Sequence, residues 1–301
     1  MVTSGPEPVS AGQPTLLVLG ARGRVGRIVR DTVPALGWRL RLLGRTPITL
    51  DSGENAEVVT ADIHDTERLA EAMRGVAGVL HLAGIPREDQ FERILEANID
   101  GTYRVFETAS RVGVGRVLYA SSNHIVGRLP NPPLAEAPLL GVDVPHRPDS
   151  FYGLSKSFGE TLGRLYADKR GLRVACLRIG SCMPRPTAVR HLSTWLSPGD
   201  TARLLHACLT APDLHYAVMY GVSANTRGCW DLAPGKAVGY EPQDDAERYA
   251  AEIFATHGAP DPDDPDLRYL GGVLAGTDLP SPPRAPGTPE GTGGTPAPGN
   301  T

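Results

Sequence analysis

Short apolar runs alternate with longer helical patterns along most of this chain, and that order restricts the folds it can adopt. The apolar runs cover residues 15–19, 39–43, 57–59, 78–82, 116–120 and 173–179. Between several of them, apolar residues recur at a spacing of three to four, as in 25–36, 66–73, 91–111 and 152–170. Strands alternating with helices predict a mostly parallel sheet covered by helices on both faces, with ligands at the carboxyl ends of the strands.

A glycine-rich turn joins the first apolar run to the first helical segment. It spans Gly20 to Gly26, at a position where glycines let the backbone approach a pyrophosphate at a helix N-terminus. A turn without a ligand is the alternative, but the strand-turn-helix setting favours a dinucleotide. The expected fold class is therefore α/β, a Rossmann-like doubly wound parallel sheet with a small C-terminal substrate-binding part. The turn residues expected to contact the dinucleotide are Gly20, Arg22, Gly23, Arg24, Val25 and Gly26.

The kind of dinucleotide depends on the end of the second apolar run. The chain has Gly44-Arg45 there, where an NAD-binding protein usually has an acid for the ribose hydroxyls. Arg45 and Arg22 could instead pair with the extra phosphate of NADP, or they could be ordinary surface arginines. The expected cofactor is NAD or NADP, and Gly44-Arg45 favours NADP. Asp62, with Ile63 beside it, is a candidate acceptor for the adenine amino group; the alternative is an acid near a helix N-cap.

One of only three lysines in the chain lies four residues after a tyrosine, in Tyr152-Gly-Leu-Ser-Lys156. On a helix these side chains share a face, and the ammonium would favour the phenolate form of the tyrosine, which can act as a general base. An ordinary surface helix is the alternative. Ser122-Asn123-His124 follow the fifth apolar run, so hydroxyl and amide groups emerge at a strand end, on the ligand side of such a sheet.

The composition points to a small-molecule partner. The formal net charge is -4 and charges of both signs are interspersed, so neither a nucleic-acid-binding stripe nor a membrane-binding arm is expected. The four cysteines have no C-x-x-C spacing and no nearby histidine pairs, which predicts no metal site and free thiols in a reducing cytoplasm. No apolar run is long enough to span a bilayer.

Composition also divides the chain into a folded part and two ends. Residues 15–275 are expected to form a single NAD(P)-binding domain, with its substrate-binding elements mainly in 181–250. Residues 1–14 are polar and residues 276–301 are rich in proline and glycine, which limits the apolar surface they can bury. We therefore expect two disordered tails around a cytoplasmic protein that forms a homo-oligomer.

Several motifs follow one another in an order that matches a known family. They are Ser122-Asn123-His124, Tyr152-Gly-Leu-Ser-Lys156, Arg178-Ile-Gly-Ser181-Cys182, Arg190-His-Leu-Ser-Thr-Trp195, Ser223-Ala-Asn225 and Trp230-Asp231. The serine, tyrosine and lysine resemble the catalytic set of the short-chain dehydrogenase/reductase superfamily, and the glycine spacing is similar to that of its extended branch. Over about residues 16–272 the motifs together resemble bacterial uronate dehydrogenases.

The resemblance implies an oxidoreductase that oxidises the anomeric carbon of a hexuronic acid, such as glucuronate or galacturonate, to an aldarolactone. It implies that Arg190 holds the carboxylate, because a guanidinium pairs with it through two donors. The chain departs from the family at Gly44-Arg45, where the family has an acid, and at Pro86, where the family has a serine that can reach the substrate. The implied sugar-acid contacts are Ser122, Asn123, His124, Tyr152, Ser181 and Arg190, and the further dinucleotide contacts are Leu82, Ala83, Gly84, Tyr152, Lys156 and Ile179.

The expected mechanism uses the Tyr152 phenolate to accept the proton of the C1 hydroxyl while hydride leaves C1 for the nicotinamide ring. Ser122 would hydrogen-bond the reacting oxygen. Lys156 would favour ionisation of the phenol and contact the nicotinamide ribose, and Asn98 would join a proton relay.

Two other functions are open on the same scaffold. A nucleotide-sugar epimerase or dehydratase is one, although Ser122-Asn123-His124 lacks the Asp-Glu pair that a dehydratase uses for elimination. A dinucleotide-sensing regulatory protein without turnover is the other. The intact serine, tyrosine and lysine argue against a sensor, which has no need of a proton acceptor.

Overall fold

A seven-stranded parallel sheet forms the centre of the protein. The computed structural model describes residues 12–131, 139–261 and 263–281, and the strands of its main sheet lie in the order β3-β2-β1-β4-β5-β6-β9. All six pairings in this sheet are parallel, which confirms the predicted α/β class. The strands are β1 Thr15–Leu19, β2 Arg39–Gly44, β3 Ala56–Thr60, β4 Gly78–His81, β5 Arg116–Ser122, β6 Arg173–Ile179 and β9 Tyr216–Gly221.

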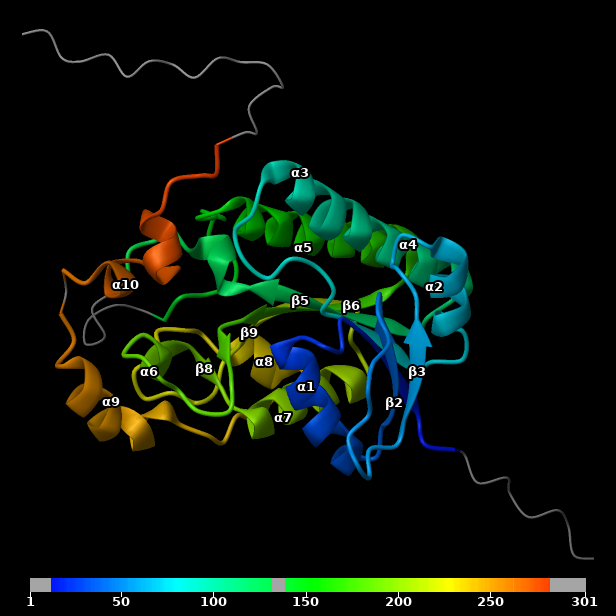
Figure 1. The fold of residues 1–301 in the computed structure, drawn as a ribbon, viewed down its shortest axis with the longest axis horizontal. Coiled ribbons are helices and arrows are strands. Elements are labelled where there is room, and N and C mark those ends of the chain that lie inside the picture. Colours follow the sequence, from blue (N-terminus) through cyan, green and yellow to red (C-terminus); the bar gives the residue numbers. More distant parts are fainter. Residues whose placement is uncertain (1–11, 132–138, 262, 282–301) are drawn as a thin grey trace, which may run out of the picture.

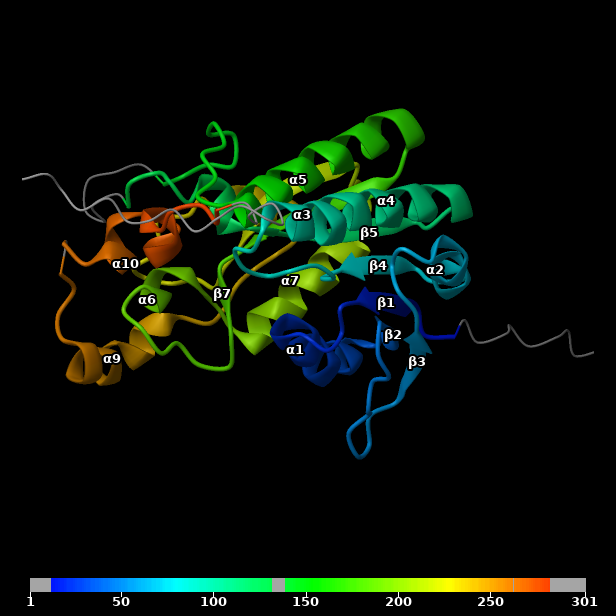
Figure 2. The same ribbon diagram turned by 45° about the horizontal axis from the view of Figure 1, so that its top comes forward.

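Helices cover both faces of this sheet (Figure 1). Successive side chains of a strand point to opposite faces of the sheet. Leu16 and Val18 of β1 therefore pack on the face covered by α1 and α7, and Leu17 and Leu19 pack on the face covered by α2, α4 and α5. Figure 2 shows the same two layers from another direction. The helical segments of these layers are α1 Arg24–Thr32, η1 Val33–Leu36, α2 Thr66–Met73, α3 Phe91–Ile94, η2 Leu95–Asp100, α4 Gly101–Val112, α5 Phe151–Arg170 and α7 Pro198–Thr210.

Most of the predicted elements are present, with two differences. The pattern at 91–111 predicted one continuous helix, but the chain forms a π-helical stretch, η2, between α3 and α4. Such π turns are rare and often occur at functional sites. The sequence also gave no prediction for β9, an edge strand that pairs only with β6 among the described strands, or for the helix α7 before it.

A smaller lobe extends from the carboxyl ends of the strands. Its apolar contacts include Ile125 and Val126, which directly follow β5, packed with Trp230 and Leu270. A second cluster joins Trp195 to the C-terminal helices. The lobe contains η3 Asn123–Val126, β7 Ser181–Cys182, α6 His191–Thr194, β8 Trp195–Leu196, η4 Ala246–Tyr249, α9 Ala250–His257, α10 Pro265–Arg268 and η5 Gly272–Gly276, whereas α8 Ala233–Ala237 packs on β9 of the main sheet.

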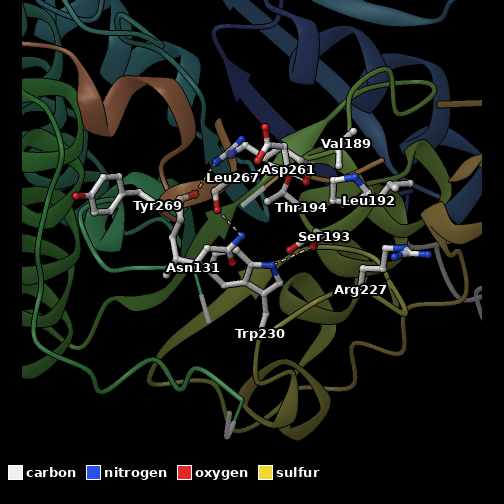
Figure 3. Close-up of a pocket in the computed structure, with 13 residues that line it drawn as sticks. Asn131, Val189, Leu192, Ser193, Thr194, Arg227, Trp230, Asp261, Leu267 and Tyr269 are labelled. Carbon is white, nitrogen blue, oxygen red and sulfur yellow. Dashed lines mark hydrogen bonds between the residues drawn. The ribbon is translucent and has the colours of Figure 1, made fainter. Parts of the chain in front are cut away.

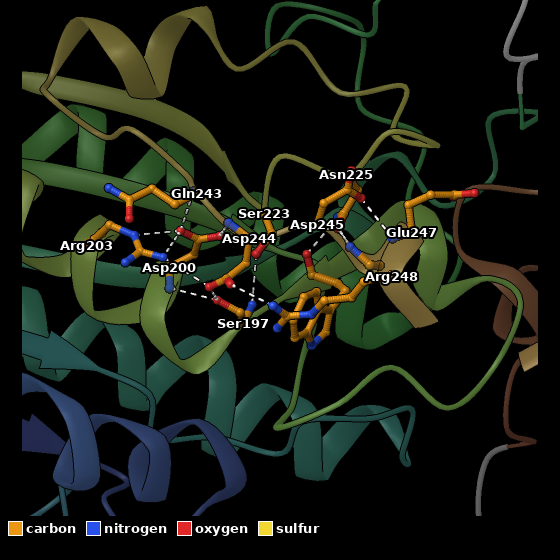
Figure 4. A network of polar contacts seen from close by, with 12 residues as sticks. Ser197, Asp200, Arg203, Ser223, Asn225, Gln243, Asp244, Asp245, Glu247 and Arg248 are labelled. Atoms are coloured by element: carbon orange, nitrogen blue, oxygen red, sulfur yellow. Dashed lines mark hydrogen bonds and ion pairs between the residues drawn. The ribbon is translucent and has the colours of Figure 1, made fainter. Parts of the chain in front are cut away.

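A network of polar contacts holds residues 240–249 against the start of α7 (Figure 4). The fully buried carboxylate of Asp200 accepts hydrogen bonds from the backbone of Gln243 and Asp244, at 2.8 and 3.0 Å, and from Arg203. Asn225 adds three bonds to neighbouring backbone groups. Because buried polar groups require partners, this network fixes the path of the lobe.

The predicted tails lie mostly outside the described residues, which exclude 1–11 and 282–301. Buried Ala275 lies in η5, which ends at Gly276, so ordered packing extends to that point, and the domain limits 15–275 stay a prediction. Within the described ranges no helix has the length and apolar character needed to cross a membrane.

Candidate active site

The glycine turn makes close contact with the loop after β4. Gly20 has a left-handed φ of 86°, and a Cβ atom on it would lie 2.8 Å from the backbone of Leu82 and Ala83. A Cβ on Gly26 would lie 2.7 Å from the backbone of Ala21. Only glycine allows approaches this close. The turn after β1 and the loop after β4, which both contain predicted dinucleotide contacts, therefore lie against each other.

The N-terminus of α1 is suited to an anion. Gly23 is its N-cap, so no side chain caps the helix, and the first turn contains no acid. Uncapped backbone N–H groups and the positive end of the helix dipole favour phosphate oxygens. The turn thus has the groups that a pyrophosphate requires, and contacts of Arg22, Arg24 and Val25 with a dinucleotide stay a prediction.

A second group of predicted dinucleotide contacts lies at the ends of β2 and β3. Arg22 donates a hydrogen bond to the Thr46 hydroxyl, and Arg45 is exposed. Burial tends to raise the pKa of Asp62, but hydrogen bonds from the backbone and ring of His64 and the charge of Arg45 lower it below its usual range. Asp62 is thus an ionised acceptor near Arg45, and Ile63 is buried beneath it against the start of α4.

The serine, tyrosine and lysine meet where β5 ends and α5 begins. Ser122 is the last residue of β5, and the Lys156 ammonium lies 5.5 Å from the centre of the Tyr152 ring and 5.0 Å from that of Tyr119. Burial raises the pKa of Tyr152, while the neighbouring Ser122 hydroxyl lowers it in part. Burial also lowers the pKa of Lys156 to about 8. In the described residues the ammonium has no hydrogen-bond or carboxylate partner, so it is available to a ligand.

Asn98 lies close to this set but its polar atoms are already used. Its Oδ1 accepts a hydrogen bond from the backbone of Ile85 at 2.7 Å, and its Nδ2 donates to the Ile85 carbonyl at 3.0 Å and to Ser155 Oγ at 3.1 Å. Gly84, with φ of 139°, passes so near that a Cβ on it would lie 2.9 Å from Asn98 Oδ1. The side chain of Asn98 thus positions the loop and α5, and the proton relay through Asn98 stays a prediction.

His124 is oriented by a buried acid that the sequence analysis missed. Its Nδ1 lies 2.7 Å from Oδ2 of Asp149, and its ring lies edge-on to Tyr152 with 5.7 Å between ring centres. A carboxylate at Nδ1 fixes the proton there and leaves Nε2 free for another group. Asp149 also accepts a hydrogen bond from Ser150, the N-cap of α5. Its position next to a helix N-cap is the feature of the sequence that could have indicated Asp149.

Asn123 and Arg190 meet at one backbone carbonyl. Asn123 Nδ2 donates to the carbonyl oxygen of Leu270 at 3.2 Å, and an amino group of Arg190 donates to the same oxygen at 2.7 Å. Arg190 Nε is buried without a partner among the described residues, and the guanidinium has no ion pair there. Burial lowers the pKa of Arg190, although the charges of Asp266 and Asp149 raise it in part. A partly buried guanidinium without a paired carboxylate is suited to an acidic ligand.

A cavity of about 230 Å³ is lined by Arg190 and by residues of the lobe (Figure 3). Its walls are mainly apolar, and they include Thr194, Trp230 and Tyr269. Thr194 is hydrogen-bonded to Ser181 at 2.8 Å, which ties the predicted Ser181 to this wall. Neither Ser122 nor Tyr152 lines the cavity, so the reacting end of the site lies outside it.

Other motif residues serve the scaffold. Arg178 forms a buried ion pair with Glu160 at 2.9 Å, linking β6 to α5. The Trp195 indole donates to the Met183 carbonyl, and Ser223 and Asn225 bond to the backbone beside α6 and β8. The predicted Ile179 ends β6, half-buried against the α1 side of the core. In the described ranges no group of three or more histidine, cysteine or acidic side chains could hold a metal ion.

The doubly wound sheet, the glycine turn and the Ser-Tyr-Lys set define a class, the dinucleotide-dependent oxidoreductases of Rossmann type. Residues 16–213 match the NAD dependent epimerase/dehydratase family, and the chain belongs to that family.

The similar proteins include dehydrogenases of uronic acids, of glucose 6-phosphate and of L-arabinose. The chain is 42% identical over 259 residues to the uronate dehydrogenase of Agrobacterium fabrum, covering 86% of this chain and 96% of that protein. It superposes on a mutant uronate dehydrogenase of Agrobacterium tumefaciens complexed with NAD with a TM-score of 0.82 and 40% identity, covering 88% of this chain and 98% of that chain. A glucuronic acid dehydrogenase from Chromohalobacter salexigens gives a TM-score of 0.82 and 38% identity, with 89% and 98% covered. The resemblance found in the sequence is confirmed.

Proposed function

We propose that this protein is an NAD(P)-dependent dehydrogenase that oxidises C1 of a hexuronic acid to an aldarolactone. The observation that carries the proposal is that the site contains both the Ser122, Tyr152 and Lys156 set and the partly buried guanidinium of Arg190, which has no ion pair among the described residues. The first set handles a proton, and the second selects a carboxylate. The similarity to uronate dehydrogenases supports the same activity.

Each side chain has a defined task in this reaction. Tyr152 accepts the proton of the C1 hydroxyl, and Ser122 donates a hydrogen bond to the reacting oxygen. The Lys156 ammonium favours the phenolate, which otherwise costs about 1.4 kcal/mol for each unit of pKa above the working pH. The bound dinucleotide supplies the nicotinamide ring that takes the hydride from C1.

Arg190 and the groups around it orient the sugar acid. Its free guanidinium edge binds the carboxylate. Arg190 and Asn123 both donate to the Leu270 carbonyl, and Asn123 directly follows the last residue of β5. His124 offers Nε2 to a sugar hydroxyl because Asp149 holds Nδ1. Ser181, through Thr194, completes the contact surface. The carboxylate is thus recognised at the end opposite C1.

NAD is the cofactor that the family and the NAD-complexed relative support. We propose that NADP is also accepted and is favoured by Gly44-Arg45, because exposed Arg45 and neighbouring Arg22 offer guanidinium groups near the ribose end of the site. The dinucleotide contacts proposed are those predicted from the sequence, centred on the turn at Gly20 and the loop at Leu82 to Gly84.

The alternative functions are not favoured. The similar dehydrogenases cover most of the chain, and Ser122, Tyr152 and Lys156 are placed for proton transfer, which a sensor does not require. The positions after Ser122 hold Asn123 and His124 rather than the acid pair of a dehydratase.

We also propose a cytoplasmic homo-oligomer. All four cysteines are free and buried, as expected in a reducing compartment. Exposed apolar side chains occur on neighbouring segments of the α5 layer, and a second copy of the chain would cover them; sedimentation of a Leu165→Glu variant tests this. These side chains are Phe91, Leu95, Tyr103, Leu154 and Leu165.

A matched substrate panel tests the activity. Glucuronate and galacturonate are compared with glucose and galactose, which differ only by lacking the carboxylate, using NAD and NADP in parallel. Formation of reduced nicotinamide with the uronates, and much less with the neutral sugars, is expected. Equal rates with both groups would remove the carboxylate role of Arg190, and no reduction with any sugar would refute the dehydrogenase.

A further inference from the structure

Helix α5 begins with backbone groups that need partners from outside the helix. The first four N–H groups of any helix lack intrahelical acceptors. Ser150 serves two of them, accepting from Gly153 N at 2.9 Å through its hydroxyl and from Leu154 N at 2.9 Å through its carbonyl. The helix has no acid of its own in the first turn. The N–H groups of Phe151 and Tyr152 therefore require another acceptor.

Glu88 supplies that acceptor from the loop after β4. Its Oε1 accepts from Phe151 N and its Oε2 from Tyr152 N, both at 3.0 Å. Each carboxylate oxygen is thus bonded to one N–H group of the first turn. Such charge-assisted bonds are roughly twice as strong as neutral ones, and two of them fix orientation as well as distance.

The same loop is attached to α5 at two further points. The rings of Phe91 and Phe151 meet edge-on with 5.3 Å between their centres. Asn98 bonds to Ile85 on one side and to Ser155 on the other. At its start the loop lies against the turn at Gly20. The loop therefore joins the dinucleotide-binding turn to the helix that carries the proton acceptor.

We propose that Glu88 is a positioning residue for Tyr152, holding the backbone of the proton acceptor in register with the dinucleotide-binding loop. The proposal rests on the dehydrogenase function above and adds a residue to its site. Glu88 acts only through the backbone of Tyr152, so its contribution is to the geometry of proton and hydride transfer. A small misplacement of a reacting group can reduce the rate about a hundredfold.

The charge of Glu88 gives the role a distinctive signature. A carboxylate at a helix N-terminus offsets the positive end of the dipole, which disfavours a phenolate in the same turn. Removing the charge therefore lowers the pKa of the proton acceptor, even though the lost anchor lowers kcat. A purely structural defect would lower kcat without this shift. The other charged or titratable groups around the phenol are unchanged in such a variant: Lys156, His124, Asp149, Tyr119 and His81.

Variants of the full-length protein test the proposal. Glu88→Gln keeps the size of the side chain and Glu88→Ala removes it. Asp89→Asn is the matched control, because Asp89 lies on the same loop but bonds to Gln90 and Arg93 instead of α5. The measurements are kcat and KM for a uronate, the pH profile of kcat, binding of NADH by fluorescence, and amide hydrogen exchange in the first turn of α5.

Glu88→Gln is expected to lower kcat about tenfold and Glu88→Ala up to about a hundredfold. The midpoint of the kcat profile moves to lower pH, KM and NADH binding change little, and exchange at Phe151 and Tyr152 becomes faster. Asp89→Asn stays within about twofold of the wild type, because the bonds it alters hold the start of α3 and not α5.

Two results would overturn the proposal. One is an unchanged kcat and pH profile in both Glu88 variants. The other is a kcat that falls only in proportion to the folded fraction, measured by circular dichroism, with no shift of the profile. If the wild type oxidised no sugar acid, the proposed function would fail separately, and unchanged amide exchange in the variants would then refute the anchor itself.

Discussion

The dinucleotide end and the substrate lobe both depend on glycines that allow close approach, but their partners come from different distances along the chain. At the dinucleotide end, Gly26 meets Ala21 within the same turn, and only Gly20 of this turn meets a distant segment, at Leu82 and Ala83. In the lobe, a Cβ on Gly271 would lie 1.8 Å from Oδ2 of Asp149, and one on Gly272 would lie 2.7 Å from Nε of Arg190. A local turn has a sequence signature, whereas a contact between residues as far apart as Arg190 and Gly272, or Asp149 and Gly271, has none.

The two regions also differ in what their motifs do. The glycine turn leaves the N-terminus of α1 without a side-chain cap, which suits the dinucleotide proposed there. In the lobe, most residues of the family motifs, such as Trp195, Ser223 and Asn225, form hydrogen bonds within the scaffold and leave Arg190 as the charged group toward the substrate. Substitutions should therefore distinguish a chemical region, which contains Tyr152 and affects kcat, from a recognition region, which contains Arg190 and affects KM.

Tyr152→Phe should have the largest effect and tests the chemical region. Removing the proton acceptor lowers kcat by about a hundredfold to ten-thousandfold, the usual range for general acid-base catalysis. NADH binding, followed by fluorescence, is retained. Because burial raises the pKa of Tyr152, the wild-type oxidation rate should increase as pH rises toward that pKa, since the phenolate is the active form. A variant with wild-type activity would break the division between the two regions.

Arg190→Met tests the recognition region. Loss of hydrogen bonds to a carboxylate, worth about 1.5–3 kcal/mol, should raise KM for uronates about tenfold to a hundredfold with a smaller change in kcat. Arg227→Met is the matched control, because Arg227 lines the same cavity but is paired with Glu247 at 2.6 Å. Kinetics with a uronate and its neutral sugar measure both; an equal loss for the two substrates would contradict the assignment.

Gly272→Ala sharpens the comparison at the long-range contact. Gly272 has φ of 66°, and an added Cβ would overlap both Asp266 Oδ1 and Arg190 Nε. The displaced Arg190 should raise KM for uronates by roughly tenfold, with about 1 kcal/mol of lost stability from the left-handed backbone. Gly276→Ala is the control, because nothing lies within 4 Å of its Cβ position. Thermal unfolding and uronate kinetics report the two effects. Identical behaviour of the two variants would show that the glycine contact does not position Arg190.

Arg45→Asp is expected to have the smallest effect, since the side chain is exposed. The substitution restores the acid usual in NAD-binding proteins, so the ratio of kcat/KM for NADP over NAD should fall by about tenfold. Uronate KM should not change. An unaltered ratio would show that Arg45 is an ordinary surface arginine.

Much of the fold followed from patterns within short segments. Strands β1 and β6 and helix α2 have the predicted limits, because strand and helix periodicities are local. The π turn at η2 was not predictable in this way. It places Asn98 between Ile85 and Ser155, and nothing in the sequence of 91–111 indicates those partners.

The sequence by itself determined the order of strands and helices, the glycine turn, the spacing of Tyr152 and Lys156, and the family. These depend on neighbours within about one helical turn or on motif order. Only the tertiary structure decided that Glu88 anchors α5, that Asp149 orients His124, and that Asn123 and Arg190 share the Leu270 carbonyl. The physical reason is that a buried polar group must find a partner, and in the folded chain that partner is chosen by spatial proximity rather than by distance along the sequence.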